Sequence, residues 1–340
     1  MLLNRKKLFA ILLIFFSLLI ISWFVLFEYS VRWLEKSIDT LTSNLKQKGY
    51  TVSYSKVEIT GNPFSLKAIF QNPYIKNPKG SLEWQGQAME ISIRPWQLFT
   101  LTCTFPGHQK IFIPQTTPIP LGVLQFEGTI GIFTLNSQGN LEDVDFTVNR
   151  ISSVIGSQPQ PVFFQNTSLK IKNLSDLLNL KFAFFANVLN LEKPLNIPPH
   201  DHPFKINFEA NLSGYQPKDS FPQSLAQWRD GGGVIEISSL KLTWPPMSIR
   251  AEGTLTLDKN MYPLGSFSSK VVGFQDALAD IVKLGWVKKK NAAAASFILD
   301  LFSVPDETYG RILTIPITLQ NKALSIGPAP LLKLRPIEDF

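Results

Sequence analysis

The hydrophobic pattern of this chain has two parts, an unbroken apolar run near the N-terminus and a long alternating region after it. Residues 8–27 carry no charged side chain, and their only hydroxyl side chains are Ser17 and Ser22. As an α-helix rising about 1.5 Å per residue, such a run spans the roughly 30 Å hydrocarbon core of a bilayer. The run therefore predicts a membrane-spanning helix.

The charges around this run predict its orientation. Arg5, Lys6 and Lys7 precede it, which favours a cytoplasmic N-terminus with the rest of the chain across the membrane. The alternative is a cleaved signal peptide, whose apolar core usually has about 7–15 residues and is followed by small residues at the cleavage site. Here the run is longer and ends among bulky aromatic residues such as Trp23 and Phe24. We therefore expect residues 1–28 to be a cytoplasmic tail and an uncleaved single-pass anchor.

Residues 29–49 have the spacing of an amphipathic helix. Apolar residues recur every three or four positions, at Val31, Leu34, Ile38, Leu41 and Leu45. Charged residues occupy the other faces, and Gly49 predicts the end of the helix. We expect this helix to continue the membrane helix, or to leave it at a short bend, and to pack its apolar stripe on the first sheet.

From residue 51 onward the period changes to two. The clearest alternation covers residues 204–212, 249–257 and 313–319, and weaker alternation covers residues 66–70, 82–93, 123–135, 144–148, 169–171 and 180–188. One apolar face and one polar face are typical of half-buried antiparallel strands. The alternation changes parity near Gly86 and near Ser238, which predicts a bulge or sharp turn at each place.

Helical spacing after residue 50 is rare. It predicts a short helix over residues 221–230 and a helical hairpin over residues 274–302. The expected packing stripe of the second hairpin helix is Phe297, Ile298, Leu301 and Phe302. The chain is thus predicted to be mainly β, with an N-terminal transmembrane helix and amphipathic helix followed by long, curved antiparallel sheets and a small helical hairpin near the C-terminus.

A proline-rich stretch, residues 196–203, predicts a boundary between two β regions. We expect a first region over residues 50–199 and a second over residues 200–340, which contains the helical hairpin. One continuous curved sheet through both regions is the alternative.

Charge and cysteine content narrow the possible functions. The net charge is +7, yet the cations are scattered apart from residues 5–7 and residues 288–290. The first cluster is explained by membrane topology, and the second is typical of a solvated loop. A nucleic-acid partner is not expected, because it requires a concentrated basic face. Cys103 is the only cysteine, so an intramolecular disulfide is excluded, and its surroundings predict a buried thiol in a strand.

No catalytic, cofactor-binding or metal-binding residues are predicted. His200 and His202 could chelate a metal in extended chain, but no third ligand lies nearby in the sequence. His108 could pair with Cys103 as a thiol and imidazole, but no third group that would orient the pair is evident.

Two further patterns resemble functional sites and are expected to be structural. The densest acidic cluster, Glu142, Asp143 and Asp145, follows a turn signal and is expected to be solvated rather than to form a catalytic carboxylate pair. The glycine run at residues 231–233 is not a phosphate loop, because no Lys-Ser or Lys-Thr follows it.

The remaining candidate is the apolar surface itself. Many long strands with one apolar face need that face covered, and the predicted helices are too few and too short to cover it. The sheet either closes on itself as a sandwich or barrel, or leaves an apolar groove that could hold acyl chains. Phe182 and Phe184 share one face of residues 180–188 and are the candidate groove residues.

Several motifs resemble a known family. They are WRDGGG at 228–233, LKLTWP at 240–245, EGTL at 252–255 and IGP at 326–328, with GNPF at 61–64 near the start. These motifs resemble a family of alphaproteobacterial envelope proteins known as domain of unknown function 2125. The layout is also similar to that of the AsmA-like envelope proteins, a superfamily implicated in lipid handling. The resemblance implies a periplasmic protein held on the bacterial inner membrane and brings no catalytic residues.

Together these features favour a non-enzymatic, membrane-anchored periplasmic β protein that binds or passes lipid. Its expected partners are the inner membrane and a phospholipid or other lipid, without a cofactor. The alternative is an envelope scaffold that binds other envelope proteins through its β surface or edges.

Overall fold

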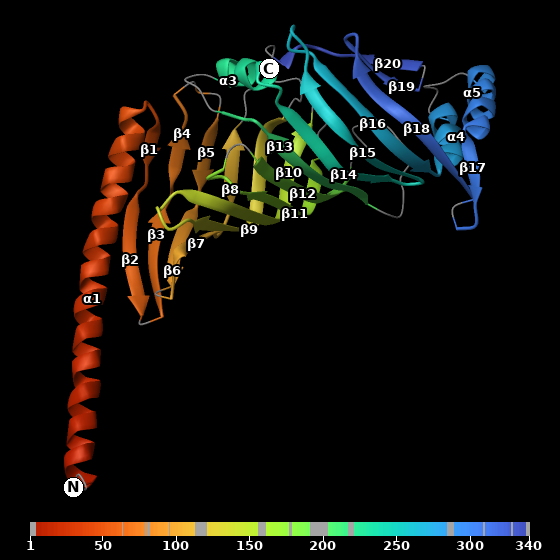
Figure 1. The fold of residues 1–340 in the computed structure, drawn as a ribbon. Coiled ribbons are helices and arrows are strands. Elements are labelled where there is room, and N and C mark those ends of the chain that lie inside the picture. Colours follow the sequence, from red (N-terminus) through yellow and green to blue (C-terminus); the bar gives the residue numbers. More distant parts are fainter. Residues whose placement is uncertain are drawn as a thin grey trace.

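One long helix and one very large sheet make up the protein. The computed structural model describes residues 5–62, 64–78, 80, 82–94, 96–112, 121–155, 161–176, 179–190, 203–216, 221–283, 289–308, 310–327 and 329–337. Helix α1 (Arg5–Gln47) precedes a 20-stranded antiparallel sheet and extends well beyond one end of it (Figure 1). The predicted fold class, mainly β with a long N-terminal helix, is confirmed.

Helix α1 joins the predicted anchor and the predicted amphipathic helix without a bend between them. Its described part from Leu12 onward is long and apolar enough to cross a membrane, with a mean hydropathy of 2.3 in its most apolar window. The helix ends at Gln47, close to the predicted stop at Gly49, which adopts the left-handed conformation with φ of 83°. The amide groups of Gly49 and Tyr50 then bond the carbonyls of Lys46 and Leu45 at 2.9 and 3.0 Å.

The second half of α1 lies against the first strand of the sheet, β1 (Thr51–Ser53). Four members of the predicted apolar stripe, Val31, Leu34, Ile38 and Leu45, are half-buried. Leu41 remains 61% exposed, so the stripe is covered only in part.

The first half of the sheet contains four long strands, each divided into two segments. The segments are β1 with β2 (Lys56–Asn62), β3 (Ser65–Gln71) with β4 (Tyr74–Lys76), β5 (Glu83–Gly86) with β6 (Ala88–Arg94), and β7 (Gln97–Phe105) with β8 (Gln109–Phe112). On one side of the divisions β2 pairs with β3, β3 with β6, and β6 with β7. On the other side β1 pairs with β4, β4 with β5, and β5 with β8. Each division is therefore a short interruption of one strand.

The second half of the sheet continues in chain order. Its strands are β9 (Leu121–Leu135), β10 (Leu141–Ile155), β11 (Val162–Lys172), β12 (Asn179–Leu189), β13 (Phe204–Ser213), β14 (Val234–Trp244), β15 (Met247–Leu257), β16 (Pro263–Val272), β17 (Ser303–Asp306), β18 (Gly310–Gln320), β19 (Ala323–Ile326) and β20 (Ala329–Lys333). From β9 to β16 each strand pairs with the next, and β16 then pairs with β18. The sheet is thus a meander, in which neighbours in the chain are neighbours in space (Figure 1).

The predicted domain boundary falls between β12 and β13. Most of it lies outside the described residues, but the two flanking strands pair from Asn179 with Ser213 to Val188 with Phe204. The sheet is therefore continuous at this point, and the division into two β regions stays a prediction.

The predicted short helices are present as α3 (Phe221–Asp230), α4 (Phe274–Lys283) and α5 (Lys289–Leu301). The predicted packing stripe of the last helix is wrong, because Phe297 and Leu301 are 71% and 73% exposed and Phe302 is 54% exposed; the side chain of Ile298 lies outside the described ones. The helix instead buries the small Ala292 and packs Leu299 against the cluster around Phe274. Its position at the end of the sheet leaves the opposite side of the helix without a layer to pack on.

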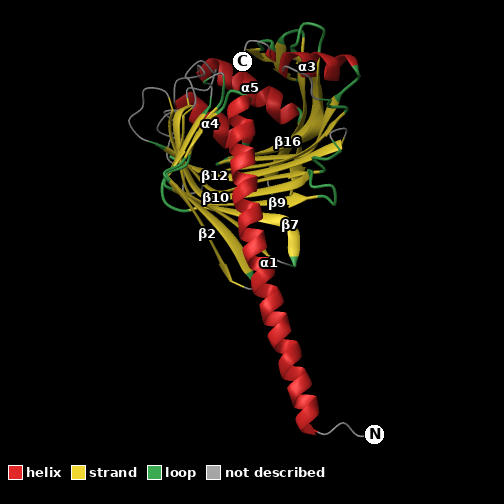
Figure 2. Cartoon of the chain, turned by 90° about the vertical axis from the view of Figure 1, so that its left-hand side faces the viewer, coloured by secondary structure: helices red, strands yellow, loops and turns green. Residues whose placement is uncertain are grey.

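A line of left-handed residues crosses the sheet from β3 to β11, and we call it the crease. It runs through Asn72, Gly107, Gly128 and Asn166, with φ of 49°, 75°, 63° and 50°. Glycine and asparagine adopt this conformation at the lowest cost. The first two residues lie at strand divisions and the last lies in a register shift between β11 and β12. Seen from the side of α1, the sheet is curved rather than flat (Figure 2).

Both predicted changes of parity correspond to backbone irregularities. Near Gly86 the chain breaks between β5 and β6, and near Ser238 both pairings of β14 shift register. Gln109 stabilises the first break, since its fully buried side chain donates through Nε2 to the carbonyls of Ala88 and Pro106, each at 3.0 Å.

Candidate functional site

One face of the sheet is apolar across almost its entire length. A single row of directly paired residues contains, in spatial order, Gly61, Leu66, Ile93, Leu101, Phe133, Val144, Ile171, Phe182, Ala210, Ile237, Gly253, Phe267, Ile317 and Ile326. Directly opposed residues in antiparallel strands project to the same side of the sheet. This row, which contains no polar side chain, defines what we call the apolar face.

The next row, two residues away on each strand and three residues away on β14, is also apolar. Its members are Ile59, Ala68, Ile91, Cys103, Gly131, Phe146, Leu169, Phe184, Phe208, Leu240, Ala251, Ser269 and Ile315. The single hydroxyl in it, that of Ser269, donates to the Ile315 carbonyl at 2.7 Å.

The irregularity at Ser238 keeps these two rows on one side of the sheet. Ile237 and Leu240 are three positions apart in β14, whereas their partners Ala210 and Phe208 are two apart in β13. In a regular strand, residues three positions apart such as Ile237 and Leu240 would project to opposite faces. The bulge therefore preserves the apolar face across β14.

The two candidate groove residues lie near the middle of the apolar face. Phe182 is paired with Ile171 and Ala210, and Phe184 is paired with Leu169 and Phe208. Both phenyl rings are half-buried. Their role in binding a ligand stays a prediction.

The apolar face is not covered by a second layer of described elements along the middle of these two rows. Its aromatic residues Phe133, Phe146, Phe208 and Phe267 are half-buried although each lies between neighbouring strands. Among the described elements, the main contacts of α1, α4 and α5 with the sheet are to β1, β15 and β17, away from its middle. The sheet is therefore an open one, not a sandwich or closed barrel.

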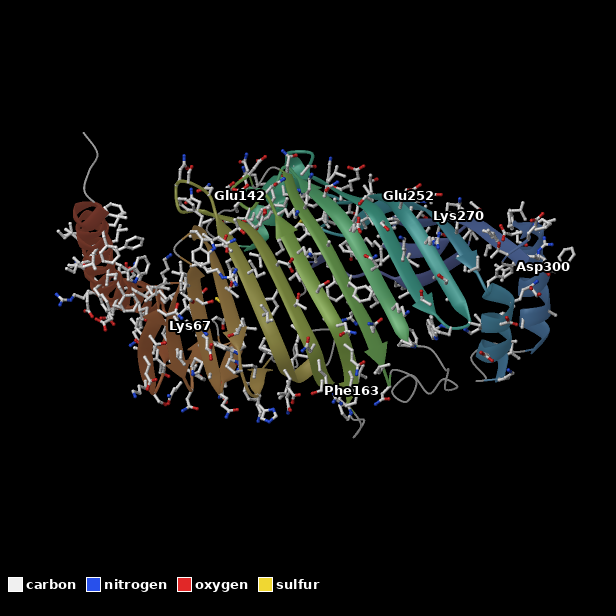
Figure 3. All side chains as sticks on the ribbon, turned by 90° about the horizontal axis from the view of Figure 1, so that it is seen from below. Lys67, Glu142, Phe163, Glu252, Lys270 and Asp300 are labelled. Atoms are coloured by element: carbon white, nitrogen blue, oxygen red, sulfur yellow. The ribbon has the colours of Figure 1, made fainter. Side chains whose placement is uncertain are left out.

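The opposite face carries the charged residues. Lys170 and Asp145 form an ion pair across β11 and β10 at 2.8 Å, and Lys67 lies 3.9 Å from Glu90. Charged side chains continue along this face as far as Lys270 on β16 (Figure 3). A sheet with one charged face and one open apolar face presents two distinct surfaces to its surroundings.

The WRDGGG motif has a structural role. Trp228 is 3% exposed and donates through Nε1 to the Ser213 carbonyl at 2.7 Å, and it packs against Leu257 and Met261. Gly233 passes directly beneath the indole, where a Cβ atom would lie 2.1 Å from Nε1. The motif thus fixes α3 to the end of the sheet.

The structure does not bring Cys103 and His108 together as a reactive pair. Cys103 is 8% exposed on the apolar face, paired with Ile91 and Gly131, and burial raises the pKa of its thiol to about 11. His108 is exposed at the crease, where its Nδ1 lies 3.2 Å from Oε1 of Glu127. His200 and His202 lie outside the described residues.

The raised pKa of Cys103 predicts slow alkylation. At pH 8 in the folded protein, the thiolate fraction should be about 100-fold below that of an ordinary cysteine, and burial should slow the reaction further. Iodoacetamide labelling followed by mass spectrometry should therefore show little modification until denaturant is added. Rapid labelling of the native protein at pH 8 would contradict the buried position.

The acidic cluster supports the turn between β11 and β12. Glu142 accepts a hydrogen bond from the Ser175 hydroxyl, and Asp143 accepts one from the Asn173 amide at 3.2 Å. Within the described part of the chain, no three side chains of His, Cys, Asp or Glu converge as metal ligands would.

A long apolar helix leads into an open antiparallel sheet that has one apolar face and one charged face. This is the architecture of a membrane-anchored β protein. The model of the family described as "Uncharacterized protein conserved in bacteria", domain of unknown function 2125, matches residues 29–335. The chain belongs to this family, which confirms the resemblance of its motifs. No curated protein and no solved structure matched the chain. The wider similarity to the AsmA-like envelope proteins stays a prediction.

Proposed function

We propose that this protein binds lipid without catalysing a reaction, and that it holds acyl chains on its apolar face. In this proposal α1 anchors the chain in the bacterial inner membrane and the sheet extends into the periplasm. The observation that carries the proposal is the continuous apolar row, from Gly61 beside α1 to Ile326 in β19.

The energetics favour an apolar ligand. An open apolar surface of this length is unfavourable in water, and burying each acyl CH₂ group contributes about 0.8 kcal/mol. An acyl chain lying across the strands would cover half-buried rings such as Phe182 and Phe184, while its headgroup stays in solvent. The row contains no polar side chain that would need a partner on the ligand.

The test is mass spectrometry of lipids that co-purify with the detergent-solubilised protein. We expect phospholipid or another diacyl lipid to be retained above the amount bound by a fusion that carries α1 alone. Equal lipid content in the two samples would count against the proposal.

A second candidate function is an envelope scaffold that binds protein partners. It is favoured by an exposed apolar patch at the far end of the molecule, formed by Phe297, Leu301, Phe302 and Val304. Protein partners captured by the full chain, in the absence of retained lipid, would support the scaffold instead.

The proposed orientation has its own test. The cations before the apolar run favour a cytoplasmic N-terminus, so alkaline phosphatase fused after Phe340 should be active. A cytoplasmic reporter at the same position should be inactive. The reverse result would place the sheet on the cytoplasmic side.

A further inference from the structure

The end of β2 lies beside α1 at the limit of its apolar run. The ring of Phe27, the last residue of that run, is so close to Gly61 that a Cβ atom there would lie 2.7 Å from Cε2 of the ring. Only glycine allows this approach without displacing the ring or the strand. Because the apolar run of α1 ends at Phe27, Gly61 lies close to the outer boundary of the membrane that the helix crosses.

The hairpin formed by β2 and β3 extends beyond this level toward the N-terminal end of α1. An apolar recess of about 350 Å³ separates helix and strand, and it is lined by Phe16, Leu19, Ile20, Trp23, Phe24, Phe27, Gly61 and Asn62. The turns between β2 and β3 and between β6 and β7 are the lowest points of the sheet (Figure 1). Both turns therefore lie alongside the apolar part of the helix.

These two turns expose large aromatic side chains. Phe64 and Trp96 are 66% and 61% exposed, and their ring centroids lie 6.2 Å apart. Phe99, near the start of β7, is 51% exposed, and the neighbouring Arg94 is also exposed. Tryptophan with other aromatic residues and a nearby cation is the composition found where proteins meet the interfacial layer of a bilayer.

We propose that the β2–β3 and β6–β7 turns rest in the membrane that α1 spans, with Phe64 and Trp96 in the interfacial layer of its outer leaflet. Leu66 lies two positions after Phe64, and its partner Ile93 lies three positions before Trp96. This end of the apolar face therefore begins at the level of the lipid. This inference rests on the proposed function. Turns that lie in the membrane give a lipid that leaves the bilayer direct access to the apolar face of the sheet.

The test measures the depth of Trp96 in full-length protein reconstituted in vesicles of phosphatidylethanolamine and phosphatidylglycerol. In a Cys103→Ala background, Trp96→Cys is labelled with an environment-sensitive fluorophore. We expect a spin label carried by lipid near its headgroup to lower the fluorescence roughly twofold or more, and aqueous iodide to have little effect. Phe64→Cys should give the same result and serves if the first variant does not fold.

The matched control is Leu82→Cys at the other end of the same strands. Leu82 is 48% exposed, and the neighbouring Pro78 lies beside Gly49, about 30 Å along α1 from Phe27. Its label should respond to iodide and not to the lipid-borne quencher. The proposed membrane position of the turns would be wrong if iodide quenched the labels at positions 96 and 82 equally and the lipid-borne spin label quenched neither. This readout does not depend on retained lipid, so it can fail or succeed independently of the lipid-binding proposal.

Discussion

Replacing Phe184 by glutamate should remove most of the bound lipid while the protein remains folded. Phe184 is half-buried on the open apolar face, between Leu169 and Phe208. A carboxylate there can stay hydrated in the empty protein, but an acyl chain lying over it would strip that water at high cost. We expect a severalfold fall in lipid per protein by mass spectrometry, with the thermal unfolding transition retained.

Phe185→Glu is the matched control. Phe185 is the next residue of β12 and is also half-buried, but it projects to the opposite face, where its partners are Ser168 and Asn207. The same change of side chain at this position should leave lipid content unaltered.

Phe184→Ala separates an open face from a closed core. In a closed core this truncation costs about 3–5 kcal/mol, whereas on an open face fewer neighbours are lost and the free energy of unfolding should fall by much less. Loss of folding in Phe184→Glu, or unchanged lipid content in a folded variant, would remove this strand from the binding surface and favour the scaffold function.

Trp228→Ala should have the largest effect on stability, lowering the free energy of unfolding by about 3–5 kcal/mol. The substitution leaves a cavity between α3 and the sheet, beside Leu257 and Met261, and removes the hydrogen bond to the Ser213 carbonyl. Chemical denaturation of the purified protein, followed by circular dichroism, measures the change.

Two further variants test the cause of this loss. Trp228→Phe keeps most of the apolar contact and loses the hydrogen bond, so it should cost about 1–2 kcal/mol. Trp96→Ala removes an equally large side chain that is 61% exposed and should have almost no effect in detergent. If Trp228→Ala cost no more than Trp96→Ala, the anchoring role of the WRDGGG motif would be wrong.

Much of the fold follows from local sequence patterns. The apolar run, the glycine at position 49 and the change to a period of two predict α1 and the strands, and the parity changes predict the irregularities at Gly86 and Ser238. These features depend on near neighbours in the chain. The packing stripe of α5 could not be predicted in this way, because which side of a helix is covered depends on where the sheet ends.

The candidate site depends on information that no single segment contains. Phe182 and Ile326 belong to one row only because the strands between them pair in a particular register. Likewise, Phe64 and Trp96 lie 6.2 Å apart although each stands in a different turn. An aromatic residue in a short turn near a membrane anchor is the signal that could have identified them.

The meander also determines how the molecule can be built and altered. In a meander, each long strand pairs with the strand that precedes it in the chain. Assembly therefore needs only local contacts, which favour rapid folding. Strands lie about 4.8 Å apart, so one additional hairpin would lengthen the apolar face by about 10 Å without changing any existing pairing. The number of hairpins thus sets how far from α1 the sheet extends (Figure 1).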